Sequence, residues 1–266
     1  MSDEATRTSA VRWLSDRVRV ILAPNPSPMT LEGTNTYLIG DDPLVIMDPG
    51  PDLDDHLASI EAVVAGAAVE TILITHKHID HAEVAERCAA LFDSPIASNG
   101  RPGDSHIGEG DRIGDLLAVA TPGHSSDHLC FVLERDKTLF SGDHILGRGT
   151  TVVAHPDGDM GAYMASLERL RDLDLQRIFP GHGPVVTEPQ AVIEEYIEHR
   201  LMRERQVVDG LEAAAEPVTP EELVARIYYD VDPVLHPIAA MSVRAHLAKL
   251  AREGRAVQDG ERWRPS

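Results

Sequence analysis

Three histidines and an aspartate stand within six residues of one another in the stretch THKHIDHA. They are His76, His78, Asp80 and His81, and the apolar run ETILI comes directly before them. Along an extended chain, side chains two residues apart point to the same side, so His76 and His78 can reach one metal ion together. Asp80 and His81 lie beyond a turn and face a second position. The spacing therefore predicts ligands for two metal ions.

Two metal ions need more than four ligands, which predicts further histidine or aspartate residues at strand ends. The chain has His124 in TPGHSSDH, Asp143 in LFSGDH and His182 in IFPGHG, each just after an apolar run and a glycine. A lone histidine or aspartate is more often a surface, core or turn residue, but seven in this order favour a metal site. Because imidazole dominates the set, we expect two Zn²⁺ ions, with Mn²⁺ or Fe²⁺ as alternatives for the same ligands.

The series HxHxDH followed by His, Asp and His resembles the pattern of the metallo-β-lactamase superfamily over roughly residues 10–200. The resemblance implies one zinc ion held by His76, His78 and His124, another held by Asp80, His81 and His182, and Asp143 as the bridge between them. It also implies an α+β fold, a four-layer αββα sandwich with the metal ions at one edge.

Zinc lowers the pKa of a bound water from near 16 to about 7, so we expect a metal-bridging hydroxide as the nucleophile. The chain has neither a GxSxG elbow nor a GxxxxGK phosphate loop, which favours hydrolysis by water. A net charge of about +1 at the centre would stabilise an anionic group or a developing oxyanion. Asp80 is the expected catalytic residue, because it can orient the hydroxide and receive its proton.

Hydrophobic periodicity indicates the elements that must position these side chains. Strands are expected at VRVILA, TNTYLIG, PLVIMDPG, ETILIT, LLAVATPGH, HLCFVLE, TLFSGDH and RIFPGHG, and helices at DLDDHLASIEAVVAG, AEVAERCAALF and MGAYMASLERLRDL. Every motif with His or Asp therefore falls where a strand gives way to a loop, held by a rigid sheet behind it.

A second domain is expected near the C-terminus. A long helix begins at Pro189, the stretch AAAEPVTP reads as a linker, and two amphipathic helices and a hairpin around Asp259-Gly260 follow. Two helices and a hairpin are typical of a winged-helix module. We expect a catalytic domain over residues 1–200, including part of the linking helix, and a winged-helix domain over residues 201–266.

Composition narrows the classes of function. The formal net charge of -20 repels polyanions at long range, which argues against tight nonspecific binding of nucleic acid. No stretch approaches the roughly 20 apolar residues of a membrane span, and the polar start MSDEATRTSA is unlike a secretory signal. We therefore expect a cytoplasmic protein with no membrane contact. Cys88 and Cys130 are expected to be buried, reduced thiols.

The stretch NPSPMTLEGTNTYLIG and the appended winged helix resemble the lactamase-beta-two-like branch of the superfamily, which includes a single-strand endoribonuclease. This resemblance implies an endoribonuclease-like phosphodiesterase acting on single-stranded RNA, with Asn35 and Tyr37 as substrate contacts. A core position for Tyr37 is an equal alternative. Hydrolysis of a small thioester, as in glyoxalase II, stays open, and so does a non-catalytic DNA-binding regulator. The winged helix could instead pack within the chain or form a homodimer.

Other polar residues near the motifs have secondary roles. Candidates for fixing the orientation of the imidazoles, with plain turn or packing roles as equal alternatives, are Thr75, Thr121, Asp127, His128 and His144. Lys77 and Ile79 lie between ligands and are expected to face the substrate. Histidines outside the motifs are expected not to bind metal, and they are His56, His106, His155 and His199.

Overall fold

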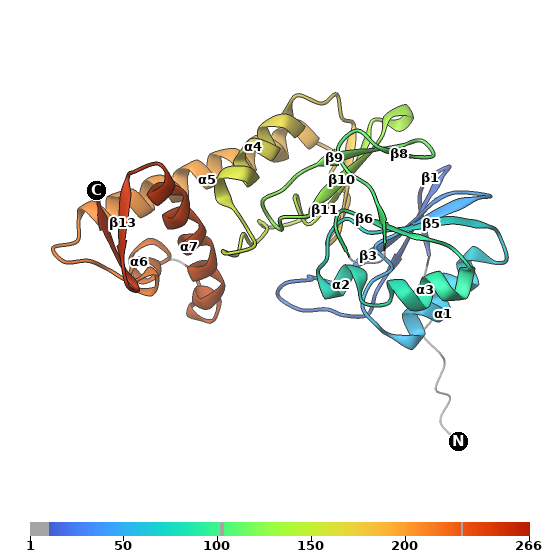
Figure 1. The fold of residues 1–266 in the computed structure, drawn as a ribbon, viewed down its shortest axis with the longest axis horizontal. Coiled ribbons are helices and arrows are strands. Elements are labelled where there is room, and N and C mark those ends of the chain that lie inside the picture. Colours follow the sequence, from blue (N-terminus) through green and yellow to red (C-terminus); the bar gives the residue numbers. More distant parts are fainter. Residues whose placement is uncertain (1–10, 102–103, 230) are drawn as a thin grey trace, which may run out of the picture. The chain divides into compact units, whose positions relative to one another are not determined.

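The computed structural model describes residues 11–101, 104–229 and 231–266 (Figure 1). The polar start MSDEATRTSA lies outside the described residues. The chain divides into two compact units. The first comprises residues up to 120 together with 127–149 and 176–187, and the second comprises 121–126, 150–175 and 188–266. The predicted domain boundary at residue 200 falls inside a helix of the second unit and stays a prediction.

The first unit begins with a seven-stranded sheet whose strands follow one another in chain order. They are β1 (Arg12–Ser15), β2 (Val18–Leu22), β3 (Asn35–Gly40), β4 (Leu44–Met47), β5 (Val69–Leu73), β6 (Ile96–Ser98) and β7 (Ser105–His106). The first four strands pair antiparallel, and β4 to β7 pair parallel. Parallel strands need crossover connections, and helices α1 (Asp54–Val64) and α3 (Ala85–Phe92) supply two of them.

The second sheet of this unit has five strands. In spatial order they are β12 (Arg177–Pro180), β11 (Thr138–Gly142), β10 (Leu129–Leu133), β9 (Leu116–Ala120) and β8 (Arg112–Ile113), with the 3-10 turn η1 (Glu134–Asp136) between β10 and β11. All neighbours pair antiparallel except β11 and β12, which are parallel. The carboxyl ends of β11 and β12 therefore meet at one edge of the sheet.

Strand β4 shows how the layers are built. Val45 and Met47 face the other sheet and pack in a core that includes Phe140 of β11. Leu44 and Ile46 face the opposite way, into a core shared with helices α1 and α3. Successive side chains of a strand point to opposite faces, so a strand that is apolar throughout is covered on both. Helices, first sheet and second sheet thus form three successive layers within this unit, and the predicted sandwich of sheets and helices is confirmed.

The second unit is mainly helical. Its elements are α4 (Met160–Arg171), α5 (Pro189–Glu212), α6 (Pro220–Ile227), the turn η2 (Pro233–Leu235), α7 (His236–Arg252) and the hairpin β13 (Ala256–Asp259) with β14 (Arg262–Pro265). Thr219 and Glu222 form a capping box at the start of α6, which fixes where that helix begins. The expected winged-helix arrangement of two helices and a hairpin is confirmed, and Trp263 of the hairpin packs into its core.

Two further predictions concern the whole described chain. Cys88 and Cys130 are both buried and neither is in a disulfide, as the sequence predicts. None of the helices in the described ranges is long and apolar enough to cross a membrane.

Candidate metal centre

Each predicted ligand lies just beyond the carboxyl end of a strand or in the short helix that follows. Strand β5 leads to His76 and His78 and then to Asp80 and His81 in α2 (Ile79–Ala82), while β9, β11 and β12 lead to His124, Asp143 and His182. The expectation that the motifs fall where strands give way to loops is thereby confirmed.

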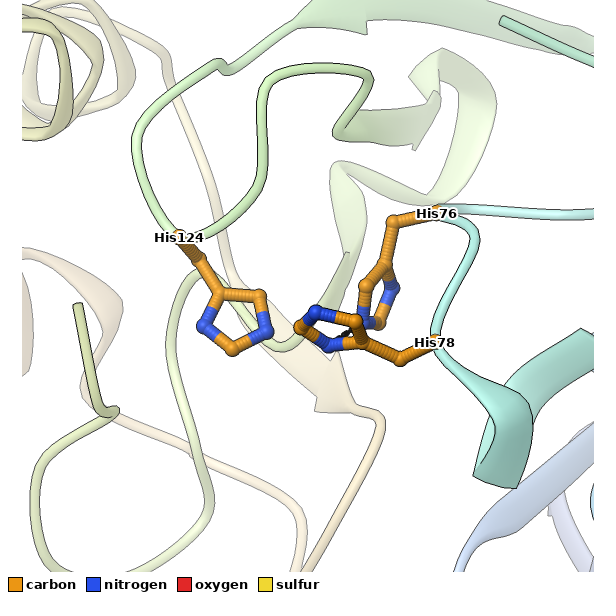
Figure 2. A group of neighbouring side chains, drawn as sticks. All are labelled: His76, His78 and His124. Atoms are coloured by element: carbon orange, nitrogen blue, oxygen red, sulfur yellow. Dashed lines mark hydrogen bonds between the residues drawn. The ribbon is translucent and has the colours of Figure 1, made fainter. Parts of the chain in front are cut away.

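Two groups of side chains in the described residues could hold a metal ion. The first is His76, His78 and His124, whose ligand atoms all lie within 4.8 Å of one another. Figure 2 shows the three rings turned toward one another. His76 Nε2 lies 2.9 Å from His78 Nδ1, so these two nitrogens converge on one point. His76 and His124 are buried, and His78 is half-buried.

The second group is Asp80, His81, Asp143 and His182. His81 Nε2 and His182 Nε2 lie 3.2 Å apart. Asp143 Oδ1 is 3.3 Å from each of these two nitrogens. Asp80 Oδ2 is 3.1 Å from His182 Nε2. His81 and His182 are fully buried, whereas the side chain of Asp80 keeps 24% of its surface exposed.

In three of the five histidines, the ring nitrogen that faces away from the group is held by an oxygen atom. The distances are 2.9 Å from His81 Nδ1 to Asp48 Oδ2, 3.1 Å from His182 Nδ1 to Gly33 O, and 2.7 Å from His124 Nδ1 to Val152 O. Carbonyl and carboxylate oxygens only accept, so each outer nitrogen must carry the proton. The inner nitrogen of the neutral ring then presents a lone pair. The residues therefore fit metal ions, which bind neutral imidazoles held in this way.

Asp48 was not among the residues singled out from the sequence. Its carboxylate accepts from the Thr75 backbone N–H at 2.8 Å and from the Thr75 hydroxyl at 2.8 Å, in addition to the contact with His81. It is buried and adopts a φ of 49°, which is uncommon for a residue other than glycine. The sequence feature that could have identified Asp48 is the run VIMDPG, where an acidic residue directly follows an apolar strand. Asp143 follows its strand in the same way.

The charged side chains of the second group shift one another's pKa values. Burial lowers the pKa of His182, but the Asp143 and Asp80 carboxylates outweigh it and raise that pKa to about 9. Burial raises the pKa of Asp143, yet His182 and His81 together hold it well below its usual value. These carboxylates therefore draw positive charge to this position, either as protons on the imidazoles or as a metal cation.

Glycines allow the backbone to approach the ligands closely. A Cβ on Gly181 would lie 2.6 Å from Asp143 Oδ1 and 2.7 Å from His81 Cε1. Gly142 has a φ of 47°, and a Cβ there would lie 2.8 Å from the Thr75 hydroxyl. A larger residue at Gly181 would displace two of the proposed ligands, and one at Gly142 would collide with Thr75 and His128 beside them. Glycine is therefore required before Asp143 and His182.

Asn35 and Tyr37 support the turn that carries His182. Asn35 Nδ2 donates to the carbonyl oxygens of Pro180 and Gly183, at 3.0 Å each. The Tyr37 hydroxyl donates to Pro180 O at 2.7 Å, and only 3% of the residue is exposed. This placement favours the core alternative for Tyr37. A substrate contact by either residue stays a prediction.

Two of the candidates for orienting the imidazoles contact ligands directly. The Thr75 hydroxyl lies 3.0 Å from His76 Nδ1. The backbone N–H of Asp143 donates to His128 Nε2 at 3.1 Å. Thr75 and His128 therefore belong to the shell of residues around the ligands.

The remaining candidates lie near the loops. Asp127 Oδ2 accepts from the backbone N–H of Lys77 at 2.9 Å, which holds the loop between His76 and His78. Thr121 and His144 are buried. Ile79 is 72% exposed beside the centre, where it is available to a substrate. Neither group of ligands includes the four histidines that were expected not to bind metal.

Comparisons with known protein families agree with this geometry. The profile of the metallo-beta-lactamase superfamily matches residues 29–99 and 83–182, and that of the beta-lactamase associated winged helix domain matches residues 219–263. Both matches support a sandwich of sheets and helices followed by a winged helix.

Individual proteins are similar along most of the chain. A Caenorhabditis elegans protein named Beta-lactamase-like protein 2 homolog is 35% identical over 267 residues, with 94% of this chain and 89% of that protein covered. An atrochrysone carboxyl ACP thioesterase of Aspergillus chevalieri is 36% identical over 236 residues, covering 82% of this chain and 75% of that one. Among solved structures, a beta-lactamase domain protein from Burkholderia ambifaria gives a TM-score of 0.84 at 20% identity, covering 100% of this chain and 96% of the other.

Proposed function

Because this chain belongs to the metallo-beta-lactamase superfamily of hydrolases, we propose that its two groups of ligands hold two metal ions and that it cleaves phosphodiester bonds of single-stranded RNA. The observation that carries this proposal is the convergence of three imidazoles in one group and of two imidazoles and two carboxylates in a second group. Asp143 is proposed as the ligand shared by both ions.

The ligand set indicates the kind of metal. Five imidazoles and two carboxylates make up the two groups. Such a set suits zinc, iron or manganese and is unlike the all-oxygen sites of magnesium and calcium. Zinc is our first choice. Bound metal ions would supply Lewis acidity and would lower the pKa of a coordinated water to near neutrality.

The residues of the chain have distinct roles in this proposal. His81 and His182 are buried and fixed by outer hydrogen bonds, so they act as rigid ligands. Asp80 is the more exposed of the two carboxylates, and its Oδ2 is the oxygen that contacts the imidazoles. Its other oxygen is then available to orient a water molecule and to accept a proton from it. Asp80 is the proposed catalytic residue for this reason.

Charge favours an anionic reacting group. Two divalent ions with the Asp80 and Asp143 carboxylates leave a local charge of about +2 before any water ionises. The chain as a whole has a net charge of -20, so this centre would be the place that attracts a phosphate. The similarity to a Beta-lactamase-like protein 2 homolog over 94% of this chain, together with the match to the associated winged helix domain, favours the branch to which we assign the RNA substrate.

Thioester hydrolysis is the second candidate. It is favoured by the similarity to an atrochrysone carboxyl ACP thioesterase over 82% of this chain. The exposed Ile79 beside the centre would suit an acyl chain better than a nucleotide. A tetrahedral oxyanion formed from a thioester would be stabilised by the same positive centre.

The experiment compares the two substrates directly. Purified protein loaded with zinc is given labelled single-stranded RNA and S-acyl thioesters in parallel. Asp143→Ala should abolish the true activity, and His106→Ala, a histidine exposed on the surface, should retain it. RNA cleavage that survives Asp143→Ala would come from a contaminant and would overturn the RNA proposal. Thioester turnover lost in Asp143→Ala, with no RNA cleavage by the parent protein, would establish the second candidate.

A further inference from the structure

We infer that the winged-helix module positions the metal ligand His124, through the ion pair between Arg252 and Asp159. This inference rests on the proposed metal centre and adds a role for the C-terminal module. All of the contacts that carry it lie within the second compact unit.

The loop that carries His124 is held at the start of α4. The backbone N–H of Asp159 donates to Gly123 O at 2.8 Å, one residue before the ligand. The Asp159 side chain caps the helix by accepting from the backbone N–H of Ala162 at 2.9 Å. A Cβ on Gly123 would lie 2.3 Å from the Cα of Tyr163, so the loop has no room to shift toward α4. The position of Asp159 thus sets the position of the His124 loop.

Arg252 connects this point to the winged helix. It lies in the last turn of α7, and its two terminal nitrogens donate to the two carboxylate oxygens of Asp159, one of them at 2.8 Å. A bidentate pair of this kind fixes the direction of both side chains. Both side chains are partly exposed, at 54% for Arg252 and 34% for Asp159, so the pair contributes little to overall stability. Its effect is expected in the geometry of the His124 loop.

A second connection reaches His124 from α5. Arg200, which is 3% exposed, donates to Thr151 O and stacks on the Tyr163 ring with its guanidinium carbon 5.3 Å from the ring centre. The Thr151 hydroxyl lies 3.3 Å from His124 Nδ1. Arg200 therefore holds the segment whose next residue, Val152, accepts from the same His124 nitrogen at 2.7 Å.

Helix α5 is itself tied to the winged helix one turn further along. Glu204 forms ion pairs with Lys249 of α7 at 2.8 Å and with Arg255 at 2.9 Å. Both connections from His124 therefore end on α7 or the residues that follow it. The position of a histidine ligand depends on the groups that fix its outer ring nitrogen and its backbone. The winged-helix module thus acts as a support of the metal centre, with Arg252 as its positioning residue.

Arg244 offers a matched control for Arg252. It also lies on α7 and is 43% exposed, and it too pairs with a carboxylate, that of Glu221 on α6. That pair stays inside the winged-helix module and does not involve Asp159. Arg252→Met and Arg244→Met therefore remove similar exposed ion pairs, and only the first breaks the connection to His124.

The test is a titration of each metal-free protein with Co²⁺, followed by its visible spectrum and by equilibrium dialysis. Arg252→Met should weaken the binding of one of two ions by about threefold to tenfold, somewhat below the loss seen when a direct partner of a ligand is removed. It should also alter the cobalt spectrum, while Arg244→Met should behave as the parent protein does. Arg252→Lys, which keeps the charge and one hydrogen bond, should recover part of the loss. Thermal unfolding of the metal-free protein should be nearly the same in all three variants.

Cobalt binding by Arg252→Met that equals the binding of the parent protein would overturn the inference, and so would an equal loss in Arg244→Met. Arg200→Lys tests the second connection with the same readout and should also change the spectrum. If the parent protein bound no metal at all, that result would overturn the proposed metal centre itself. The two failures are distinguishable because the parent protein is measured alone.

Discussion

His81 Nδ1 lies 2.9 Å from Asp48 Oδ2, and both side chains are buried. The same oxygen accepts from the Thr75 hydroxyl, which in turn lies 3.0 Å from His76 Nδ1. One carboxylate therefore orients a ligand from each of the two groups, His81 directly and His76 through Thr75. Asp48 therefore contacts residues of both proposed metal positions, directly or through Thr75, without belonging to either group of ligands.

Replacing Asp48 by asparagine should weaken metal binding about tenfold to a hundredfold. The amide keeps the volume, but one acceptor oxygen becomes an NH₂ group that faces donors. The measurement is competition for zinc with a chromophoric chelator. Asp52→Asn is the control, because Asp52 is exposed and pairs with Arg87 away from the ligands. Equal zinc affinity in the two variants would mean that Asp48 does not orient the ligands.

Removing the metal ions should lower the melting temperature of the protein. A ligand that binds only the folded state stabilises it by about 2.7 kcal/mol at a hundredfold excess over its dissociation constant. For a chain of this size, that corresponds to a decrease of roughly 5–10 °C. Calorimetry before and after dialysis against a chelator measures it. Zinc should restore the transition, whereas magnesium should not, because the ligands are mostly imidazoles. Identical melting curves would contradict a bound metal.

Tyr37→Phe separates a core role from a substrate contact. The Tyr37 hydroxyl donates to Pro180 O from a position that is 3% exposed, and burial raises its pKa well above the usual value. Losing that hydrogen bond should cost about 1 kcal/mol of unfolding free energy. KM should be unchanged, as in the control Tyr229→Phe, whose side chain is 83% exposed. A raised KM at unchanged stability would instead support a contact with substrate.

The two groups of proposed metal ligands were predictable from sequence because histidine and aspartate recur at one kind of place, the end of an apolar strand. Each follows an apolar strand, and several follow a glycine, so residue type and position agree without any knowledge of tertiary contacts. Asp48 occupies the same kind of place, but in the run DPG it has the composition of an ordinary turn. Its function appears only when His81 and Thr75, which lie far along the chain, are seen to converge on it.

Tyr37 shows a second limit. Strand β3 is buried throughout, so alternation along the strand does not tell which side chains face a site and which face a core. The pair of Arg252 and Asp159 shows a third, because its partners are 93 residues apart and each has the pattern of an ordinary helix end. The α+β class and the winged helix were predictable, since both depend on local periodicity and turns.

The stability of the second unit should depend on pH through Glu204. The His246 ring and the Lys249 ammonium hold the pKa of this carboxyl at about 2 against the opposing effect of burial. Since the pKa is lower in the folded state than the ordinary value of 4.5, the stabilisation is complete above about pH 5 and is lost as the pH falls toward 2. Glu204→Gln should therefore cost about 2 kcal/mol at pH 7 and progressively less below pH 4.5.

Denaturant unfolding followed by the fluorescence of Trp263 reports on this unit, in a background where the exposed Trp13 is replaced by phenylalanine. Glu198→Gln on the exposed side of α5 is the control and should change stability by less than about 0.5 kcal/mol at any pH. A difference between Glu204→Gln and the parent protein that stayed constant from pH 7 to pH 3 would show that the charge of Glu204 is not what stabilises the unit. A difference in unfolding free energy that grows as the pH falls would contradict the prediction, because it would require the Glu204 carboxyl to be protonated in the folded state.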